Sequence, residues 1–164
     1  MYPVRLGYDE AVKRIKKLMR NGHHSEALVS SVFTIEKTLR RTLREIVVSA
    51  GFASKQADKI VSGCRGLDSL KNSWEIYEPN NRKLVDLISK TDWQQIRKST
   101  TMRNKMVHGE RVYELATCNT EATATLVALD RLKNEFDSVY GYSGWSTLSK
   151  RIKHRLHADP KVKL

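Results

Sequence analysis

The spacing of the apolar residues limits most strongly how this chain can fold. Between Ser25 and Gly51 the apolar side chains recur at helical spacing, every three or four residues at Leu28, Val32, Ile35 and Leu39, and again seven residues on, or two turns, at Ile46. This period is that of one face of an α-helix, whereas a half-buried strand alternates every second residue. The segment therefore predicts a long central helix, with Ser25 as its N-cap and Gly51 as its C-terminal stop.

The same period continues along most of the chain, and strand signals are nearly absent. Further helices are expected at about residues 9–20, 54–61, 67–77, 81–89 and 91–107, and from residue 119 or 120 onward. A capping box, with Thr91 as N-cap and Gln94 as the third helical residue, marks the start of the helix that ends before Gly109. In the last helix Leu126, Leu129, Leu132 and Phe136 should face inward. These patterns predict an all-α bundle.

The sequence from Gly141 to Gly144 interrupts the helical pattern. We expect a helical bundle over residues 1–141 and a basic C-terminal extension over residues 142–164. From Lys150 onward the extension carries six cations against one acid, Asp159. Such a tail is suited to holding an RNA backbone, and a solvated chain end is the alternative.

The charge balance points to a polyanionic partner. Lys and Arg number 30 against 18 Asp and Glu, a formal net charge of +12. So large a surplus repels itself in the folded state, and RNA or DNA is a better explanation for it than a membrane. Solubility alone is the competing explanation.

Several classes of protein are not expected. No stretch reaches the roughly 18 apolar residues that span a bilayer, and the N-terminus lacks the apolar region of a signal peptide. The cysteines, Cys64 and Cys118, are far apart and form no CxxC pair, which favours small buried thiols in a reducing cytoplasm. No Cys/His cluster has the spacing of zinc ligands, so no metal or other cofactor is expected.

The segment from Arg103 to Gly109, Arg-Asn-Lys-Met-Val-His-Gly, is the strongest candidate for chemistry. Arg103 follows Ile96 by seven residues and so falls on the helix face that otherwise looks inward. A buried guanidinium needs a partner, a bound anion or a wet interface. The alternative is structural: Arg103 extends its charge to water, and His108 simply precedes Gly109 at the helix end.

An arginine, a polar residue, three further residues and a histidine near a helix end resemble the R-x4–6-H motif of the HEPN superfamily. Here these are Arg103, Asn104 and His108, followed by Gly109. The long central helix carries Glu36 and Arg40, similar to the Glu-x-x-x-Arg pattern of many members. The resemblance implies a four- to five-helix HEPN-like bundle with short extra helices. It also implies a metal-independent endoribonuclease that acts as a homodimer.

In the roles that this resemblance implies, Arg103 and His108 are catalytic, and Asn104, Glu36 and Arg40 support them. Candidate RNA contacts are Lys105, Tyr113, Lys150, Arg151, Lys153 and Arg155. Three alternatives stay open. Glu36 and Arg40 could form an intrahelical salt bridge, Tyr113 could simply pack, and Asn104 could make an exposed hydrogen bond to His108.

The chemistry independently favours a dimer. Cleaving RNA without a metal needs a base for the 2′-OH and an acid for the leaving 5′-oxygen, and two copies supply two motif histidines. In an ideal helix Arg103 also points about 140° away from His108. The family association suggests a toxin or antiviral-defence role with a nucleotidyltransferase-like antitoxin as partner. The competing functions are a non-catalytic HEPN-like module that binds nucleic acid or nucleotide, and a DNA-binding protein.

Overall fold

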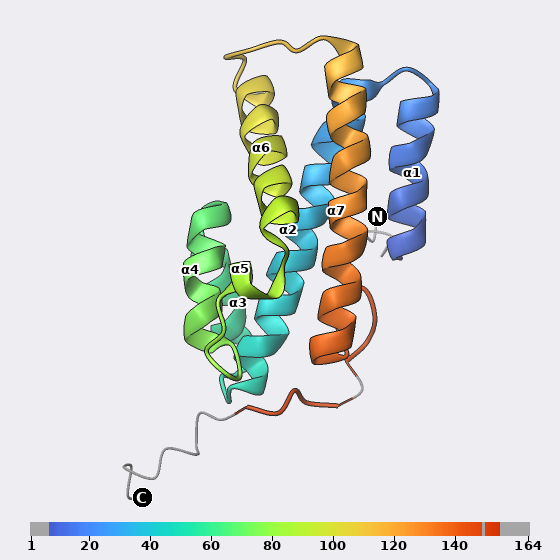
Figure 1. Ribbon diagram of the computed structural model, residues 1–164. Helices are drawn as coiled ribbons and strands as arrows, with labels where there is room; N and C mark the ends of the chain where they lie inside the picture. The colour runs from blue at the N-terminus through green and yellow to red at the C-terminus, as the bar shows by residue number, and fades with distance from the viewer. Residues whose placement is uncertain (1–6, 149, 155–164) are drawn as a thin grey trace, which may run out of the picture. The chain divides into compact units, whose positions relative to one another are not determined.

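The computed structural model describes residues 7–148 and 150–154, and within them it contains helices and no strand (Figure 1). The helices are α1 (Tyr8–Arg20), α2 (His24–Ser49), α3 (Ser54–Gly63), α4 (Leu67–Tyr77), α5 (Leu84–Leu87), α6 (Lys90–Val107) and α7 (Leu115–Tyr140). The prediction of an all-α protein is confirmed. Among the described helices, none combines the length and the apolar character needed to cross a bilayer.

The chain forms two compact units. Unit 1 comprises the residues up to Lys37 together with Lys90–Asn134, and unit 2 comprises Thr38–Ser89 together with the residues from Glu135 onward. Helices α2 and α7 contribute residues to both units. The boundary expected after residue 141 stays a prediction.

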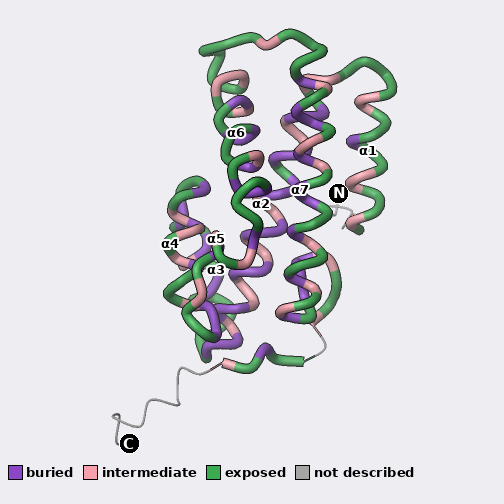
Figure 2. The backbone as a smooth tube through the Cα atoms, viewed as in Figure 1, coloured by how far each residue is buried: buried purple, intermediate pink, exposed green. Residues whose placement is uncertain are grey.

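The apolar stripe predicted on α2 is buried. Its members, Leu28, Val32, Ile35, Leu39 and Ile46, are each at most 1% exposed. Figure 2 shows buried residues recurring along α2 and α7. The inward-facing residues predicted on α7 follow the same pattern, because Leu129, Leu132 and Phe136 are buried and Leu126 is half-buried.

The apolar core of unit 1 draws residues from α1, α2, α6 and α7. It consists of Ile15, Ala27, Leu28, Val32, Met102, Cys118 and Ala122, and the partly buried Leu18, Met19, Met106, Tyr113 and Leu126 pack against it. Burying such side chains contributes roughly 1.5–3 kcal/mol for each large one. This packing joins the C-terminal part of α6, where the candidate motif lies, to α2.

A buried polar network accompanies this core between α6 and α7. The hydroxyls of Ser99 and Thr125 lie 2.6 Å apart, and the Gln95 amide donates to the Glu121 carboxylate at 2.7 Å. Burial acts to raise the pKa of Glu121, but hydrogen bonds from Lys98 and Gln95 outweigh it and lower the pKa below its usual value. The network therefore holds α6 against α7 through specific polar contacts as well as apolar packing.

Unit 2 is built around an aromatic cluster and a buried carboxylate. The rings of Trp74 and Phe136 stack with their centroids 4.9 Å apart. Glu78 is fully buried and accepts hydrogen bonds from Arg82, from the Tyr140 hydroxyl and from the backbone N–H groups of Asn80 and Arg82. After α7, the indole of Trp145 donates to the Thr38 hydroxyl at 2.9 Å.

Three helix starts differ from the prediction. The backbone N–H of Ala27 donates to the carbonyl of His23, so α2 begins before Ser25 and Ser25 is no N-cap. Helix α6 begins at Lys90, before the predicted cap Thr91. Helix α7 begins at Leu115, because the N–H of Cys118 already donates to the carbonyl of Glu114.

The helix predicted over residues 81–89 is mostly wrong, because α5 covers only Leu84–Leu87. Asn81 adopts a positive φ of 56°, and the Glu78 carboxylate binds the N–H groups of Asn80 and Arg82. These contacts hold the backbone in a turn where the apolar period alone had indicated a helix.

Candidate functional site

An ion pair joins two of the residues that the sequence singled out. The Nη2 group of Arg103, on α6, donates to the Oε1 atom of Glu36, on α2, across 67 residues of sequence. The two side chains are 16% and 17% exposed, so the pair is largely shielded from water. The Nε atom of the same guanidinium is buried, and in the described part of the protein it has no hydrogen-bond partner.

A second unpartnered donor lies one helical turn before Arg103. Thr100 is 8% exposed, and among the described residues its hydroxyl also has no hydrogen-bond partner. Residues three apart share a helix face, so the two groups are neighbours on α6. Buried polar groups in folded proteins are nearly always paired, and an exception is a place where a polar ligand atom would be favourable.

His108 lies at the end of the same helix and is exposed. Gly109 follows it with a φ of 69°, a left-handed conformation that ends the helix. The N–H of His108 donates to the carbonyl of Asn104 at 3.0 Å, and the N–H of Glu110 donates to that of Lys105 at 2.8 Å. The backbone of the motif is therefore held firmly, and the imidazole is left open to solvent.

Within one chain, Arg103 and His108 face different surroundings. Arg103 is directed to α2, where it meets Glu36, whereas His108 faces solvent. Five residues of helix separate the two side chains by about 140° of rotation. A site that uses both groups on one substrate therefore needs either a shift of the helix end or a second copy of the chain.

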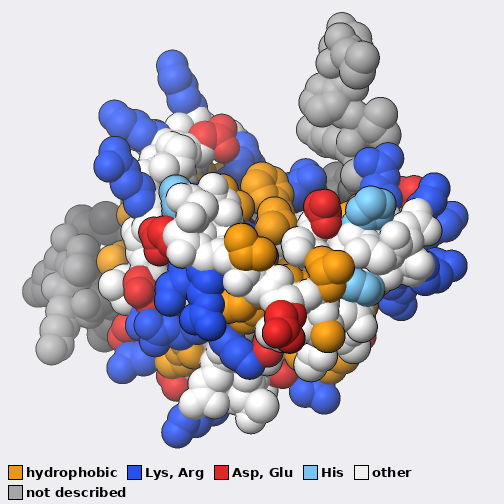
Figure 3. All heavy atoms as spheres, turned by 90° about the horizontal axis from the view of Figure 1, so that it is seen from above, with side chains coloured by type: hydrophobic (Ala, Val, Ile, Leu, Met, Phe, Trp, Pro, Cys, Tyr) orange, Lys and Arg blue, Asp and Glu red, His pale blue; other side chains and the backbone are white. Residues whose placement is uncertain are grey.

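Exposed apolar side chains lie close in sequence to both partners of the ion pair and to His108. Phe33, three residues before Glu36, is 63% exposed, and Val107, four residues after Arg103, is 60% exposed. Beyond His108, Val112 and Leu115 are 93% and 56% exposed. Figure 3 views the end of unit 1 where α6 stops and α7 starts, and hydrophobic side chains lie exposed there among Lys and Arg. A surface of this kind is typical of a contact with another molecule.

The other motif residues take lesser positions. Asn104 is exposed and meets His108 through the main chain, and Lys105 is half-buried. Tyr113 packs against the core of unit 1, and the Arg111 guanidinium lies 4.9 Å from its ring centroid. Tyr113 is therefore a packed side chain, which was the alternative to a contact with RNA.

Arg40 does not join Arg103 and Glu36. Its guanidinium donates to the carbonyls of Val61 at 3.0 Å and Cys64 at 2.9 Å, within unit 2, where it holds the C-terminal end of α3. Glu36 pairs with Arg103 and not with Arg40, so the alternative of an intrahelical salt bridge is not found either. The arginine thus satisfies free helix carbonyls, a structural role.

The cations of the basic extension also differ in their surroundings. Arg151 donates to the carbonyls of Ser49 at 3.1 Å and Val48 at 3.2 Å, at the C-terminal end of α2. Lys150 and Lys153 are exposed. Arg155 lies outside the described residues.

Sequence reasoning missed Phe33. Its position in the apolar period suggested nothing unusual, and only its separation of three residues from Glu36 could have marked it. Within the described residues, no three His, Cys, Asp or Glu side chains gather as metal ligands would. Comparison with protein-family models, curated proteins and solved structures finds no match to this chain.

Proposed function

We propose that this protein is an endoribonuclease of the HEPN type that cleaves RNA without a metal ion. The observation that carries the proposal is the Arg103 guanidinium, which Glu36 holds in a largely buried position five residues before the exposed His108. A guanidinium and an imidazole, brought to one phosphate from two copies of the chain, would supply the two functions that phosphodiester transesterification requires.

In the proposed reaction, the 2′-hydroxyl of the ribose attacks the adjacent phosphorus. One His108 takes the hydroxyl proton as the 2′-O–P bond forms, and a second His108 gives a proton to the 5′-oxygen as the P–O5′ bond breaks. The products are a 2′,3′-cyclic phosphate and a 5′-hydroxyl. Arg103 binds the phosphate and stabilises its developing charge, and a phosphate oxygen would give its Nε group the acceptor that it lacks.

The second histidine comes from a second copy in this proposal. A two-fold contact places identical groups on both sides of one substrate. The exposed Phe33 and Val107 flank the Arg103–Glu36 pair and provide apolar area for such a contact. Because Arg103 and His108 diverge within one chain, the second copy is the route by which both kinds of group reach one phosphate in this proposal.

The charge of the chain fits an RNA substrate. A net charge of +12 favours polyanions, and Lys150 and Lys153 add exposed cations. We assign the enzyme to a toxin or antiviral-defence role in the cytoplasm, with a nucleotidyltransferase-like antitoxin as its neutralising partner. The role and the partner rest on the resemblance of the motif, and the cytoplasmic location rests on the two free cysteines, Cys64 and Cys118.

A second candidate function is a non-catalytic HEPN-like module that binds nucleic acid or nucleotide. The observation that favours it is the pairing of Arg103 with Glu36, which neutralises the charge that a scissile phosphate would meet. Such a module would bind RNA in a salt-dependent way and leave it intact.

The test compares the wild type with His108→Ala and His23→Ala on end-labelled tRNA and mRNA in EDTA. His23 is a matched control, because it is an exposed histidine of the same unit. We expect cyclic-phosphate ends from the wild type and from His23→Ala, and none from His108→Ala. Products with a 3′-hydroxyl, or equal cleavage by all three proteins, would contradict the mechanism. RNA binding without cleavage by all three proteins would support the binding module.

A further inference from the structure

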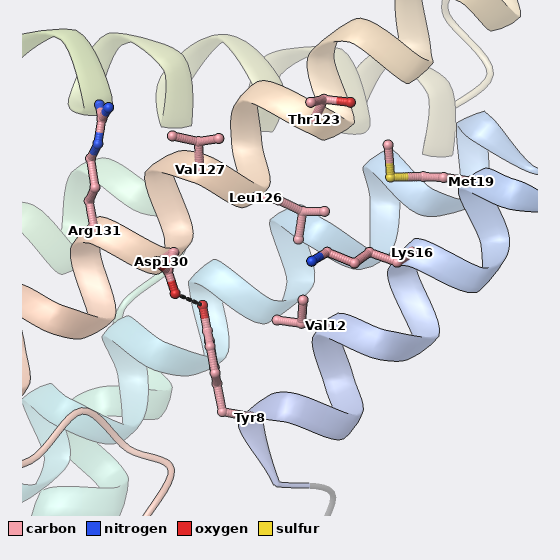
Figure 4. A pocket seen from close by; sticks show the side chains of 9 residues that line it. All are labelled: Tyr8, Val12, Lys16, Met19, Thr123, Leu126, Val127, Asp130 and Arg131. Carbon is pink, nitrogen blue, oxygen red and sulfur yellow. Dashed lines mark hydrogen bonds between the residues drawn. The ribbon is translucent and has the colours of Figure 1, made fainter.

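A groove of about 470 Å³ lies between α1 and α7 in unit 1, apart from the residues of the proposed catalytic site (Figure 4). Its apolar lining consists of Val12, Met19, Leu126 and Val127, and its polar lining of Tyr8, Lys16, Thr123, Asp130 and Arg131. Val127 is 47% exposed, so the apolar lining is open to solvent. Nothing in the ribonuclease mechanism uses this surface.

The length of the groove suits about three turns of a helix. Its lining on α1 runs from Tyr8 to Met19, eleven helical steps or about 16 Å at 1.5 Å per step. The lining on α7, from Thr123 to Arg131, runs alongside for about two turns in the opposite chain direction, because Asp130 lies at the Tyr8 end. A channel between two neighbouring helices, about three turns long and apolar in its floor, fits the apolar stripe of a third helix.

The charged groups of the groove are unequally satisfied. Asp130 accepts a hydrogen bond from the Tyr8 hydroxyl at 3.3 Å, and Arg131 pairs with Asp92 at 3.1 Å. Lys16 extends across the groove toward α7 in Figure 4, and among the described residues its ammonium group forms no ion pair. The groove therefore holds the opposite charges of Lys16 and Asp130 beside its apolar lining, and neither forms an ion pair among the described residues.

The solvent-side rim on α1 is also basic. Asp9, Lys13, Lys16 and Arg20 recur every three or four residues, so they form one stripe beside the groove, and all four are exposed. Three cations against one acid make this rim complementary to a negatively charged molecule. At the N-terminal end of α1, the Lys133 ammonium lies 5.0 Å from the ring centroid of Tyr8.

We propose that the α1–α7 groove binds an amphipathic helix of an acidic protein partner. The apolar stripe of the partner packs on Val12, Leu126 and Val127, and its acidic residues face Lys13, Lys16 and Arg20. This site does not depend on the ribonuclease function, and it would serve a regulator or an assembly partner of the protein.

Methyl NMR on the full-length protein tests the proposal with a designed peptide. The probe is a helix of about 14 residues, with Leu at positions three and four apart and Glu elsewhere, and the matched peptide carries Lys in place of Glu. We expect saturable shifts of the Val12, Met19, Leu126 and Val127 methyl groups with the Glu peptide only. Shifts elsewhere, or equal binding of the Lys peptide, would overturn the proposal.

Variants separate the groove from general charge attraction. Lys16→Glu should raise the Kd of the Glu peptide about tenfold, and Val127→Asp should abolish the methyl shifts. Lys55→Glu makes the same charge change at an exposed residue of α3 and should leave the Kd within about twofold. Equal weakening by Lys16→Glu and Lys55→Glu would overturn the proposal. So would dodecanoate shifting the groove methyl groups when the peptide does not, because the groove would then bind a small amphiphile.

Discussion

Arg103 and Glu36 form an ion pair between α6 and α2 in which each side chain is about five-sixths shielded from solvent. Shielding strengthens the attraction between two charges, and it also makes each of them costly when its partner is removed. The pair therefore links the stability of unit 1 to the residue that we place in the catalytic site.

Glu36→Gln should lower the free energy of unfolding by about 2 kcal/mol, because it leaves the Arg103 guanidinium shielded without a countercharge. Urea unfolding measures this change. Glu26→Gln, at an exposed position of the same helix, should change it by less than about 0.5 kcal/mol. The double variant Glu36→Gln/Arg103→Met should lose less unfolding free energy than the two single variants lose together, by at least about 0.5 kcal/mol. Simple additivity of the two losses would show that the residues are uncoupled.

Gly109→Ala should destabilise the protein by about 1 kcal/mol. The φ of 69° at Gly109 is unfavourable for a residue with a Cβ, although among the described residues no atom beyond its two chain neighbours stands within 4 Å of where that Cβ would lie. The effect is therefore conformational, and it should also reduce RNA cleavage by moving His108. Gly63→Ala is the control, since its surroundings are equally open and its φ is not left-handed. Equal melting temperatures for wild type and Gly109→Ala would show that the helix end tolerates other conformations.

Phe33→Lys should weaken self-association of the protein without unfolding it. Phe33 is 63% exposed beside Glu36, so a charge there disturbs an intermolecular contact far more than the core. Sedimentation velocity over a range of concentrations measures the effect. Ile76→Lys, at a residue of unit 2 that is 62% exposed, is the matched control and should leave the association unchanged. A wild-type protein that stays monomeric at all concentrations would remove the basis for a site composed of two copies.

Glu78→Gln should remove a pH-dependent part of the stability. Burial acts to raise the pKa of Glu78, but hydrogen bonds from Arg82 and from the backbone of Arg82 and Asn80 outweigh it and lower the pKa. A lowered pKa in the folded state means that the ionised form stabilises the protein. This contribution is present above the usual value of 4.5 and is lost as the pH falls through the lowered pKa.

The wild type should therefore exceed Glu78→Gln in unfolding free energy by about 3 kcal/mol at pH 7, and the difference should shrink below about pH 4.5. Urea unfolding at pH 3 to 8 measures it. The wild type and Glu75→Gln, an exposed neighbour on α4, should give parallel curves. A difference between wild type and Glu78→Gln that stays constant with pH would mean that the carboxylate charge contributes nothing.

Local chemistry made part of this structure predictable from the sequence. The apolar period placed the long helices and the buried face of α2, since residues three and four apart share one side of a helix. Gly109 was expected to end α6 because glycine adopts left-handed conformations readily, and its φ of 69° agrees. The short α5 was not predictable from its apolar period, because the Glu78 carboxylate competes for the backbone N–H groups of Asn80 and Arg82.

The candidate site shows the limit of local reasoning. By itself, the sequence determined that Arg103 falls on an inward helix face, that it needs a partner there, and that His108 stands at the helix end. Only the tertiary structure decided that the partner is Glu36, that Arg40 instead binds carbonyls at the end of α3, and that Phe33 stays exposed. These outcomes depend on which helices pack together, and contacts between residues distant in sequence leave no periodic signal along the chain.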